Sequence, residues 1–314
     1  MDTDSVNKDS IKKDSIGVVG GGLMGVGIAT KFALAGHAVI VVEASADRAA
    51  AVPVVAADIL TQLLDAGVID AAARDATLAR LRVSGELRAL AGAAAVIEAI
   101  PEVLAAKHAL YAKLEDIVAP DAIIASNTSG FPPDALSGHL AHPARFLVAH
   151  FWNPPHLIPL VEVVPGTRTA PETVERCVSL LAGTGAEPVV LKAAIPGFIG
   201  NRLQFAVLRE ALHIVRSGAA TPETVDAVMK ACLGRRYSIM GPFESADLGG
   251  LHTLMGIGAN LMPELAKDEA VLELMRAHVD KGELGVSTGQ GFYTWDQARI
   301  DDLQTRRRRQ LAGK

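Results

Sequence analysis

The segment VAHFWNPPHLIPLVEVVP, residues 148–165, contains side chains that could transfer a proton. His150 ends one apolar run and Glu162 lies inside the next, and a bend rich in aromatic and proline residues separates them. A carboxylate buried in an apolar strand is costly unless it is paired, so the imidazole is its expected partner. An imidazole held by a carboxylate is suited to act as a general base near neutral pH. The segment therefore predicts a base, His150, that is oriented by Glu162.

A glycine-rich loop near the N-terminus, GVVGGGLMGVG, has the spacing that binds a dinucleotide. Gly20 permits a tight turn, Gly22 lets the backbone approach a pyrophosphate, and Gly25 allows a helix to pack closely on the preceding strand. The backbone amides that begin this helix, at Leu23 and Met24, are predicted to face the phosphates. The motif follows an apolar strand and opens a helical pattern, which is the context that dinucleotide binding requires.

An acidic residue, Glu43, ends the second apolar strand, HAVIVVE. A carboxylate at this position accepts hydrogen bonds from the ribose hydroxyls of NAD and repels the additional phosphate of NADP. Arg48 is the nearby residue that could instead bind a 2′-phosphate. We therefore predict NAD as the cofactor, with NADP as the alternative. Oxidation of an alcohol by a nicotinamide also needs a base for the hydroxyl proton, and this is the role predicted for His150.

Length and charge exclude several classes of protein. The chain has 314 residues, of which 50% are hydrophobic, so it can form two domains with sizeable cores. A formal net charge of −5 and a pI near 6.0 argue against a nucleic-acid partner. The one basic cluster, residues 306–309, is predicted to be part of a solvated tail.

The sequence does not predict a secreted, membrane or metal-binding protein. The polar N-terminus, MDTDSVNKDSIKKDS, lacks the apolar core of a signal peptide, and no apolar run is long enough to cross a bilayer. Cys177 and Cys232 are expected to be reduced thiols of a cytoplasmic protein. The nine histidines show neither an HExxH motif nor paired-ligand spacing, so no metal site is predicted.

Short apolar strands alternate with helical patterns through the first two thirds of the chain. Strands are predicted at IGVVG, HAVIVVE, AAVIEAIP, DAIIASN, ARFLVAH, IPLVEVV and AEPVVLK. This alternation predicts an α/β fold with a parallel, doubly wound sheet of the Rossmann type. A helical hairpin, interrupted at DAGVID, is inserted after the second strand, and the pattern after IPGF is almost entirely helical.

These patterns divide the chain into four parts. We predict a polar tail over residues 1–14, an NAD-binding domain over 15–196, a helical domain over 197–296 and a basic tail over 297–314. The helical domain is expected to serve substrate binding and dimerisation.

Seven motifs together make the chain similar to the 3-hydroxyacyl-CoA dehydrogenase family. They are IGVVGGGLMGVGIA, IEAIPE, SNTSG, HFWNPP with LVEVV, PGFIGNRL, MGPFE and STGQGFY, and they span about residues 15–296. The resemblance implies that Ser129 and Asn201 contact the reacting oxygen of the substrate, with His150 as the base and Glu162 as its partner. It also implies a homodimer formed through the helical domain.

The resemblance implies further residues for the cofactor. Glu102, the second glutamate of IEAIPE, and Lys107 are expected to line the nicotinamide ribose region. Asn127, within the SNTS motif, is also assigned to the cofactor site.

Two departures from the family pattern bear on the substrate. Acyl-CoA enzymes of the family usually carry a lysine-rich helical hairpin after the second strand, but residues 32–106 of this chain contain no lysine. The segment LGRRYSIMGPFE resembles instead the branch of gulonate and carnitine dehydrogenases and lambda-crystallin, which includes enzymes that act on free hydroxy acids. The guanidinium of Arg236 would suit a substrate carboxylate, although a structural ion pair is the alternative role.

We therefore predict an NAD-dependent dehydrogenase that oxidises a secondary alcohol β to a carboxyl group, and we favour a compact free hydroxy acid. The first alternative is an L-3-hydroxyacyl-CoA dehydrogenase of fatty-acid metabolism. The second is a non-enzymatic protein, either crystallin-like or an NAD sensor, although such a protein would not need Ser129, His150, Glu162 and Asn201 together.

Overall fold

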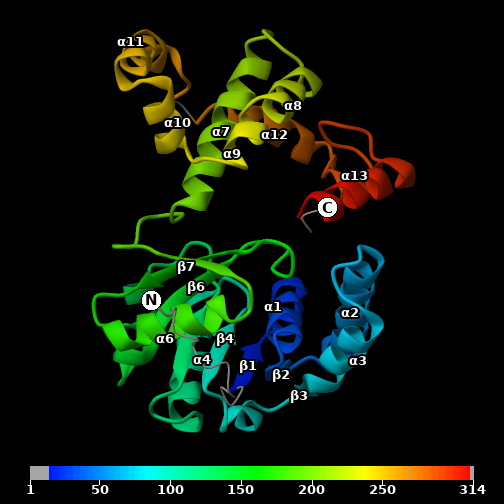
Figure 1. Cartoon of the computed structure of the whole chain (residues 1–314), viewed down its shortest axis with the longest axis vertical. Coiled ribbons are helices and arrows are strands. Elements are labelled where there is room, and N and C mark those ends of the chain that lie inside the picture. Colours follow the sequence, from blue (N-terminus) through cyan, green and yellow to red (C-terminus); the bar gives the residue numbers. More distant parts are fainter. Residues whose placement is uncertain (1–13, 268, 312–314) are drawn as a thin grey trace, which may run out of the picture. The chain divides into compact units, whose positions relative to one another are not determined.

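The computed structural model describes residues 14–267 and 269–311, and the first of its two compact units is built on an eight-stranded sheet (Figure 1). The predicted polar tail, residues 1–14, lies outside this range except for its last residue. The strands are β1 (Ser15–Val19), β2 (Ala38–Val42), β3 (Leu81–Ser84), β4 (Ala95–Glu98), β5 (Ile123–Ser126), β6 (Phe146–Phe151), β7 (Leu160–Pro165) and β8 (Glu187–Val190).

The strand order is β3-β2-β1-β4-β5-β6-β7-β8, and the first six strands are parallel. This is the order of a Rossmann fold, whose ligand crevice lies where the order reverses, between β1 and β4. The prediction of a doubly wound α/β sheet is therefore confirmed. The strand β3 was not predicted, because a half-buried four-residue edge strand, LRVS, has too little apolar pattern to be recognised.

The strands β6 and β7 form an antiparallel pair, so the sheet is not parallel throughout. A parallel connection needs a crossover of a dozen or more residues, whereas only residues 152–159 separate these two strands. The short bend therefore forces the chain to reverse. The strand β8 is parallel to β7.

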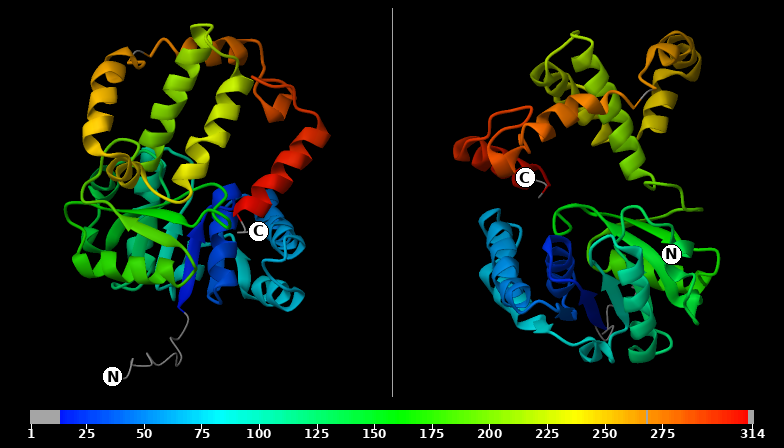
Figure 2. Two further views of the ribbon diagram at one scale, coloured as in Figure 1. Left: turned by 45° about the horizontal axis from the view of Figure 1, so that its top comes forward. Right: turned by 180° about the vertical axis from the view of Figure 1, so that it is seen from behind.

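Helices cover both faces of the sheet, which explains why its strands are apolar on both sides (Figure 2). One apolar cluster joins the sheet to α1 (Leu23–Leu34), α2 (Ala46–Asp65) and α6 (Pro171–Ala182). The other joins it to α4 (Leu104–Ile117) and the short α5 (Pro133–Ser137). The cluster with α4 contains Val96, Ile124 and Val148, so Glu98, Ser126 and His150, each two residues further along, face the same side.

The predicted helical hairpin consists of α2 and α3 (Ala71–Arg80). Side chains cap both helices at their first turns. Ser45 accepts a hydrogen bond from the backbone amide of Arg48, and Asp70 accepts one from that of Ala73 at 2.7 Å.

The chain divides into two compact units, and the second, Ile199–Thr305, is helical. Its helices are α7 (Gly200–Arg216), α8 (Pro222–Ala231), α9 (Leu233–Tyr237), α10 (Pro242–Gly249), α11 (Leu251–Leu261) and α12 (Leu272–Asp280). The sequence suggested only a basic tail after residue 296, but helix α13 occupies Gln297–Leu311, where arginine, glutamine and leucine favour helix. The residues of this helix from Arg306 onward group with the first unit.

None of the helices in the described part of the chain is both long and apolar enough to span a bilayer. Of the two cysteines, Cys177 is buried in the core and Cys232 is exposed, and neither forms a disulfide.

The glycine loop yields a test of packing with a matched control. A Cβ at Gly25 would lie 1.9 Å from the carbonyl oxygen of Gly20, so the backbone must move to admit it. We expect Gly25→Ala to lower the free energy of unfolding by about 2 kcal/mol or more, measured by thermal denaturation without cofactor. At Gly22 nothing lies within 4 Å of the added Cβ. Gly22→Ala should therefore change stability by less than about 1 kcal/mol but weaken NAD binding. Equal destabilisation by the two variants would contradict the packing role of Gly25.

Candidate active site

His150 and Glu162 form a cross-strand pair. The two residues are directly opposite in the antiparallel register of β6 and β7, so their side chains lie on the same face of the sheet. His150 Nδ1 is 2.9 Å from Glu162 Oε2, and the residues are only 5% and 1% exposed. The imidazole is therefore the partner that offsets the desolvation cost of the buried carboxylate.

The other nitrogen of the His150 ring points to Ser129. The distance from His150 Nε2 to Ser129 Oγ is 3.1 Å. Because a carboxylate only accepts hydrogen bonds, Glu162 favours the tautomer in which Nδ1 carries the proton. Nε2 is then an acceptor, so the serine hydroxyl can donate to it. The arrangement is that of a general base beside a hydroxyl group that can bind an oxygen atom of a substrate.

Two aromatic rings border the histidine. The ring centroids of Trp152 and Phe198 are each 5.5 Å from that of His150. Trp152 Nε1 also donates a hydrogen bond of 3.3 Å to Glu162 Oε2, the same oxygen that faces His150. From sequence, Trp152 was expected only as part of a rigid bend, because a side-chain contact across a bend leaves no spacing signal.

Glu102 holds the backbone of the loop that carries Ser129. Its Oε1 accepts a hydrogen bond of 2.8 Å from the amide of Ser129 and one of 2.7 Å from the hydroxyl of Thr128. Its Oε2 lies 3.2 Å from Lys107 Nζ. Glu102 and Lys107, both assigned to the cofactor site from sequence, thus contact each other, and Glu102 contacts the amide of Ser129. Their contact with NAD remains a prediction.

A buried glutamate that was not assigned from sequence, Glu98, anchors this group. It ends β4 with no exposed surface and accepts hydrogen bonds from Lys107, Tyr111 and Ser126 at 2.6, 2.5 and 2.7 Å. The pKa of the Tyr111 hydroxyl is raised, first by burial and then by the adjacent charge of Glu98. The signal for Glu98 was available, because a glutamate inside the strand AAVIEAI must find a donor.

The glycine loop has the geometry of a pyrophosphate site. Gly20 has φ +112°, and a Cβ there would lie 2.6 Å from the carbonyl oxygen of Ala99, so only glycine fits the turn after β1. At Gly22 the space is open, which permits close approach of a ligand to the backbone. Leu23, the first residue of α1, is 64% exposed, and Met24 is half-buried. These features fit the dinucleotide predicted from sequence.

Glu43 is fixed by three donors. Its carboxylate accepts hydrogen bonds from the amides of Gly21 and Ser45, each at 2.9 Å, and from the guanidinium of Arg48 at 2.8 Å. These interactions, the hydrogen bond from Arg48 foremost, lower the pKa of Glu43 to about 2. The carboxylate is therefore ionised at neutral pH, as an acceptor of ribose hydroxyls must be. Arg48, the alternative ligand for a 2′-phosphate, is here engaged by Glu43.

The remaining predicted residues take different positions. Asn127 Oδ1 accepts a hydrogen bond of 2.8 Å from the amide of Phe151, which ties the end of β5 to β6. Asn201 lies in the first turn of α7, and Arg236 is an exposed residue of α9. Both belong to the second compact unit, and their participation in the substrate site remains a prediction.

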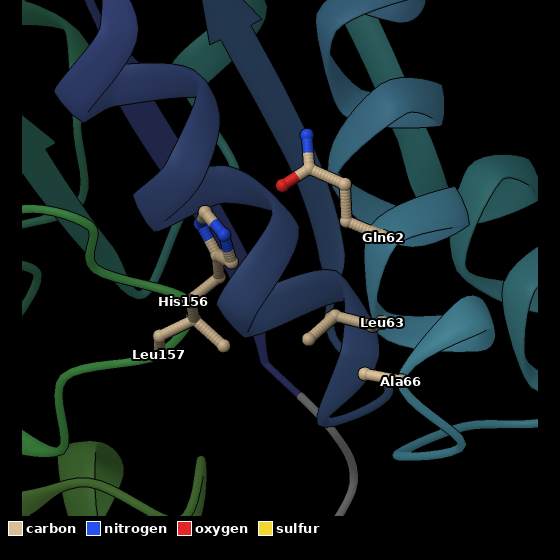
Figure 3. Close-up of a pocket in the computed structure, with 5 residues that line it drawn as sticks. All are labelled: Gln62, Leu63, Ala66, His156 and Leu157. Atoms are coloured by element: carbon tan, nitrogen blue, oxygen red, sulfur yellow. The ribbon is translucent and has the colours of Figure 1, made fainter. Parts of the chain in front are cut away.

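A second histidine, His156, packs in a different place and does not resemble a base. Figure 3 shows His156 and Leu157 from the loop after β6 opposite residues of α2, including Gln62. The hollow between them leaves no volume for a water molecule. Burial, with the charges of Lys31 and Arg307, lowers the pKa of His156 to about 4, so this ring is neutral at pH 7.

No group of three or more His, Cys, Asp or Glu side chains suited to a metal ion occurs among the residues that the structure describes. Oxidation of an alcohol by a nicotinamide needs a hydride acceptor and a group that takes the hydroxyl proton. The side chains around His150 are suited to the second of these tasks.

Substitution of Glu43 tests how the cofactor is chosen. Glu43→Gln removes the charge and leaves one acceptor oxygen, which can serve only one of the amides of Gly21 and Ser45. It also releases Arg48 to meet a 2′-phosphate. Charge-assisted hydrogen bonds are worth about 1.5–3 kcal/mol, so the preference for NAD over NADP in kcat/KM should narrow by roughly 10- to 150-fold. The double variant Glu43→Gln with Arg48→Ala controls for the arginine and should gain less activity with NADP. An unchanged preference in Glu43→Gln would place cofactor choice elsewhere.

Models of two protein domains match almost the whole chain. Residues 15–194 match the NAD binding domain of 3-hydroxyacyl-CoA dehydrogenase, and residues 197–295 match the C-terminal domain of the same enzyme.

Three relatives and one solved structure illustrate the range of this family. The 5-formyl-3-hydroxy-2-methylpyridine 4-carboxylate 5-dehydrogenase of Mesorhizobium japonicum is 32% identical, and the match covers 92% of this chain and 93% of the relative. A crystal structure of an enzyme of that name, described as an NAD⁺-dependent dismutase, superposes with a TM-score of 0.87 at 30% identity and covers 96% of both chains. The L-carnitine dehydrogenase of Streptomyces griseus is 37% identical over 82% of this chain and 77% of its own length.

A probable 3-hydroxybutyryl-CoA dehydrogenase of Deinococcus radiodurans is also 37% identical, over 71% of this chain and 79% of its own length. The match to L-carnitine dehydrogenase agrees with the branch suggested by the segment around Arg236. NAD is the cofactor, and the protein is an oxidoreductase that acts on a hydroxyl group. The chain belongs to the 3-hydroxyacyl-CoA dehydrogenase family.

Proposed function

We propose that this chain oxidises a secondary alcohol β to a free carboxyl group, with His150 as the general base. One observation carries the proposal. A single imidazole faces a buried carboxylate through Nδ1, at 2.9 Å from Glu162, and a hydroxyl through Nε2, at 3.1 Å from Ser129. An imidazole with a carboxylate at one nitrogen and a hydroxyl group at the other is suited to remove a hydroxyl proton as a general base.

The chain's residues have separate tasks in the proposed reaction. When bound, NAD accepts the hydride that leaves the carbinol carbon. Ser129 Oγ binds the substrate oxygen, and His150 Nε2 takes the proton from that oxygen as the carbonyl forms. Glu162 stabilises the resulting imidazolium by its negative charge at Nδ1. We assign a second hydrogen bond to the substrate oxygen to Asn201. In the reverse direction His150 returns the proton.

Several observations favour a compact free acid over a CoA thioester. The hairpin of α2 and α3 carries no lysine, so it lacks the usual cations for the phosphates of CoA. The guanidinium of Arg236 is exposed, and no carboxylate of the described residues forms an ion pair with it. Two relatives are named for free acids, a pyridine carboxylate and L-carnitine. A planar guanidinium is suited to bind such a carboxylate in a bidentate manner.

The acyl-CoA alternative is supported by the relative named as a probable 3-hydroxybutyryl-CoA dehydrogenase. In that case arginines of the hairpin, such as Arg74 and Arg80, would take the place of the lysines. An NAD sensor or crystallin-like protein is a weaker alternative, because neither needs a base held at 2.9 Å by a buried carboxylate.

We also propose a homodimer formed through the helical unit. Large apolar side chains are exposed on α10 and α11, including Phe243 at 86%, Leu248 at 77% and Met255 at 66%. Apolar surface of this kind is typical of a protein interface. A cytoplasmic location is proposed because the two cysteines are unpaired, as is usual in a reducing compartment.

NADH formation on a panel of substrates tests both the reaction and the substrate class. The panel pairs free acids, such as 3-hydroxybutyrate and L-carnitine, with 3-hydroxybutyryl-CoA, and His150→Ala gives the background rate. Arg236→Ala should lower kcat/KM for the best free acid by roughly 10- to 150-fold, because it removes charge-assisted hydrogen bonds worth about 1.5–3 kcal/mol. Arg235→Ala, on the same exposed turn, is the matched control and should change little.

Two outcomes would contradict the free-acid proposal. One is a wild-type preference for the thioester. The other is an equal loss on acids and thioesters in Arg236→Ala, accompanied by a lower melting temperature or a broken dimer.

A further inference from the structure

The loop that carries Ser129 is fixed by hydrogen bonds to side chains rather than by the backbone hydrogen bonds of a helix or strand. The residues 127–132 connect β5 to α5, and Ser129 itself is exposed. A hydroxyl on such a loop would ordinarily move too freely to keep a distance of 3.1 Å to His150 Nε2. Contacts of other loop residues must therefore fix the position of the Ser129 hydroxyl.

Thr128, the residue before the serine, makes the contacts that fix this loop. It is 1% exposed, and its hydroxyl donates to Glu102 Oε1 at 2.7 Å. The Oγ1 atom of Thr128 also accepts hydrogen bonds from the amides of Phe131 and Gly130 at 3.1 and 3.3 Å. The amide of Thr128 donates to Ser126 Oγ at 3.2 Å. The buried hydroxyl of Thr128 thus connects the amides of Gly130 and Phe131 to the carboxylate of Glu102.

That carboxylate is itself held in place. Lys107, 1% exposed, uses its three donor positions on Glu98 Oε1 at 2.6 Å, Glu102 Oε2 at 3.2 Å and the carbonyl oxygen of Ile100 at 3.4 Å. Because the ammonium is fully engaged, Glu102 can keep its Oε1 turned toward the loop. There Oε1 receives both the hydroxyl of Thr128 and the amide of Ser129.

We propose that Thr128 is a positioning residue, which sets the place of the Ser129 hydroxyl through the carboxylate of Glu102. The inference rests on the proposed function, because it assumes that Ser129 binds the reacting oxygen. Thr128 has no role in the chemical step itself. Its buried hydroxyl determines where Ser129 Oγ lies relative to His150, and a misplacement of about 1 Å at a reacting group costs on the order of 100-fold in rate.

The test compares Thr128→Val, which keeps the shape but removes the hydroxyl, with Thr128→Ser, which keeps the hydroxyl. With the best substrate of the panel, kcat should fall by roughly 10- to 100-fold in Thr128→Val and by less than about threefold in Thr128→Ser. Circular dichroism establishes that each variant is folded, and Thr128→Ala replaces the valine variant if that one does not fold. Failure of both variants to fold would assign Thr128 to stability alone and overturn the proposal.

A double-mutant cycle with Ser129→Ala separates positioning from general damage to the fold. If Thr128 acts through Ser129, adding Thr128→Val to Ser129→Ala should change kcat by less than about threefold. A further loss equal to that in the wild-type background, or no recovery in Thr128→Ser, would overturn the positioning role. Full activity of Ser129→Ala alone would instead contradict the proposed function, so the two failures can be told apart.

Discussion

The site depends on one physical constraint, the need to satisfy carboxylates that are buried in the apolar sheet. Glu162 is 1% exposed, and burial of a carboxylate is costly unless hydrogen-bond donors face it. The antiparallel reversal between β6 and β7 supplies them, because it places His150 directly opposite and brings Trp152 within 3.3 Å of the same oxygen. The hydrogen bond between His150 and Glu162 therefore both satisfies the carboxylate and orients the base.

Glu98 repeats this solution on β4. With no exposed surface, it collects donors from Lys107, Tyr111 and Ser126. Lys107 also forms an ion pair with Glu102, so it connects this buried cluster to a carboxylate at the surface. The ends of β4, β5 and β6 are thereby linked by charge and hydrogen bonds on the face of the sheet that α4 covers. Parallel strands bring their carboxyl ends to one edge, and this edge is where an open α/β sheet binds its ligands.

The sequence was sufficient for the parts of this arrangement that depend on local pattern. The glycine spacing predicted the loop after β1, and the apolar runs predicted seven of the strands in the described sheet. The pairing of His150 with Glu162 could be predicted because a buried charge demands a partner and the bend between them is short. The need of Glu98 for donors could be predicted, but the identity of those donors and the contacts of Thr128 and Trp152 could not, since they join residues from separate strands, helices and loops and leave no periodicity. The edge strand β3 was missed because half-buried strands of four residues resemble loops.

The central claim is that Glu162 fixes His150 with the proton on Nδ1, leaving Nε2 free to accept one. Long-range ¹H–¹⁵N correlation spectra of the protein labelled with ¹⁵N-histidine report this tautomer directly, and comparison with His150→Asn assigns the signals. Above the pH range in which the ring is protonated, we predict a protonated Nδ1 and an unprotonated Nε2 for His150. In Glu162→Gln the Nδ1–H tautomer should lose its dominance, because the amide can act as donor or acceptor. A wild-type ring with its proton on Nε2 would contradict the claim, since that nitrogen could not then take the proton of a substrate.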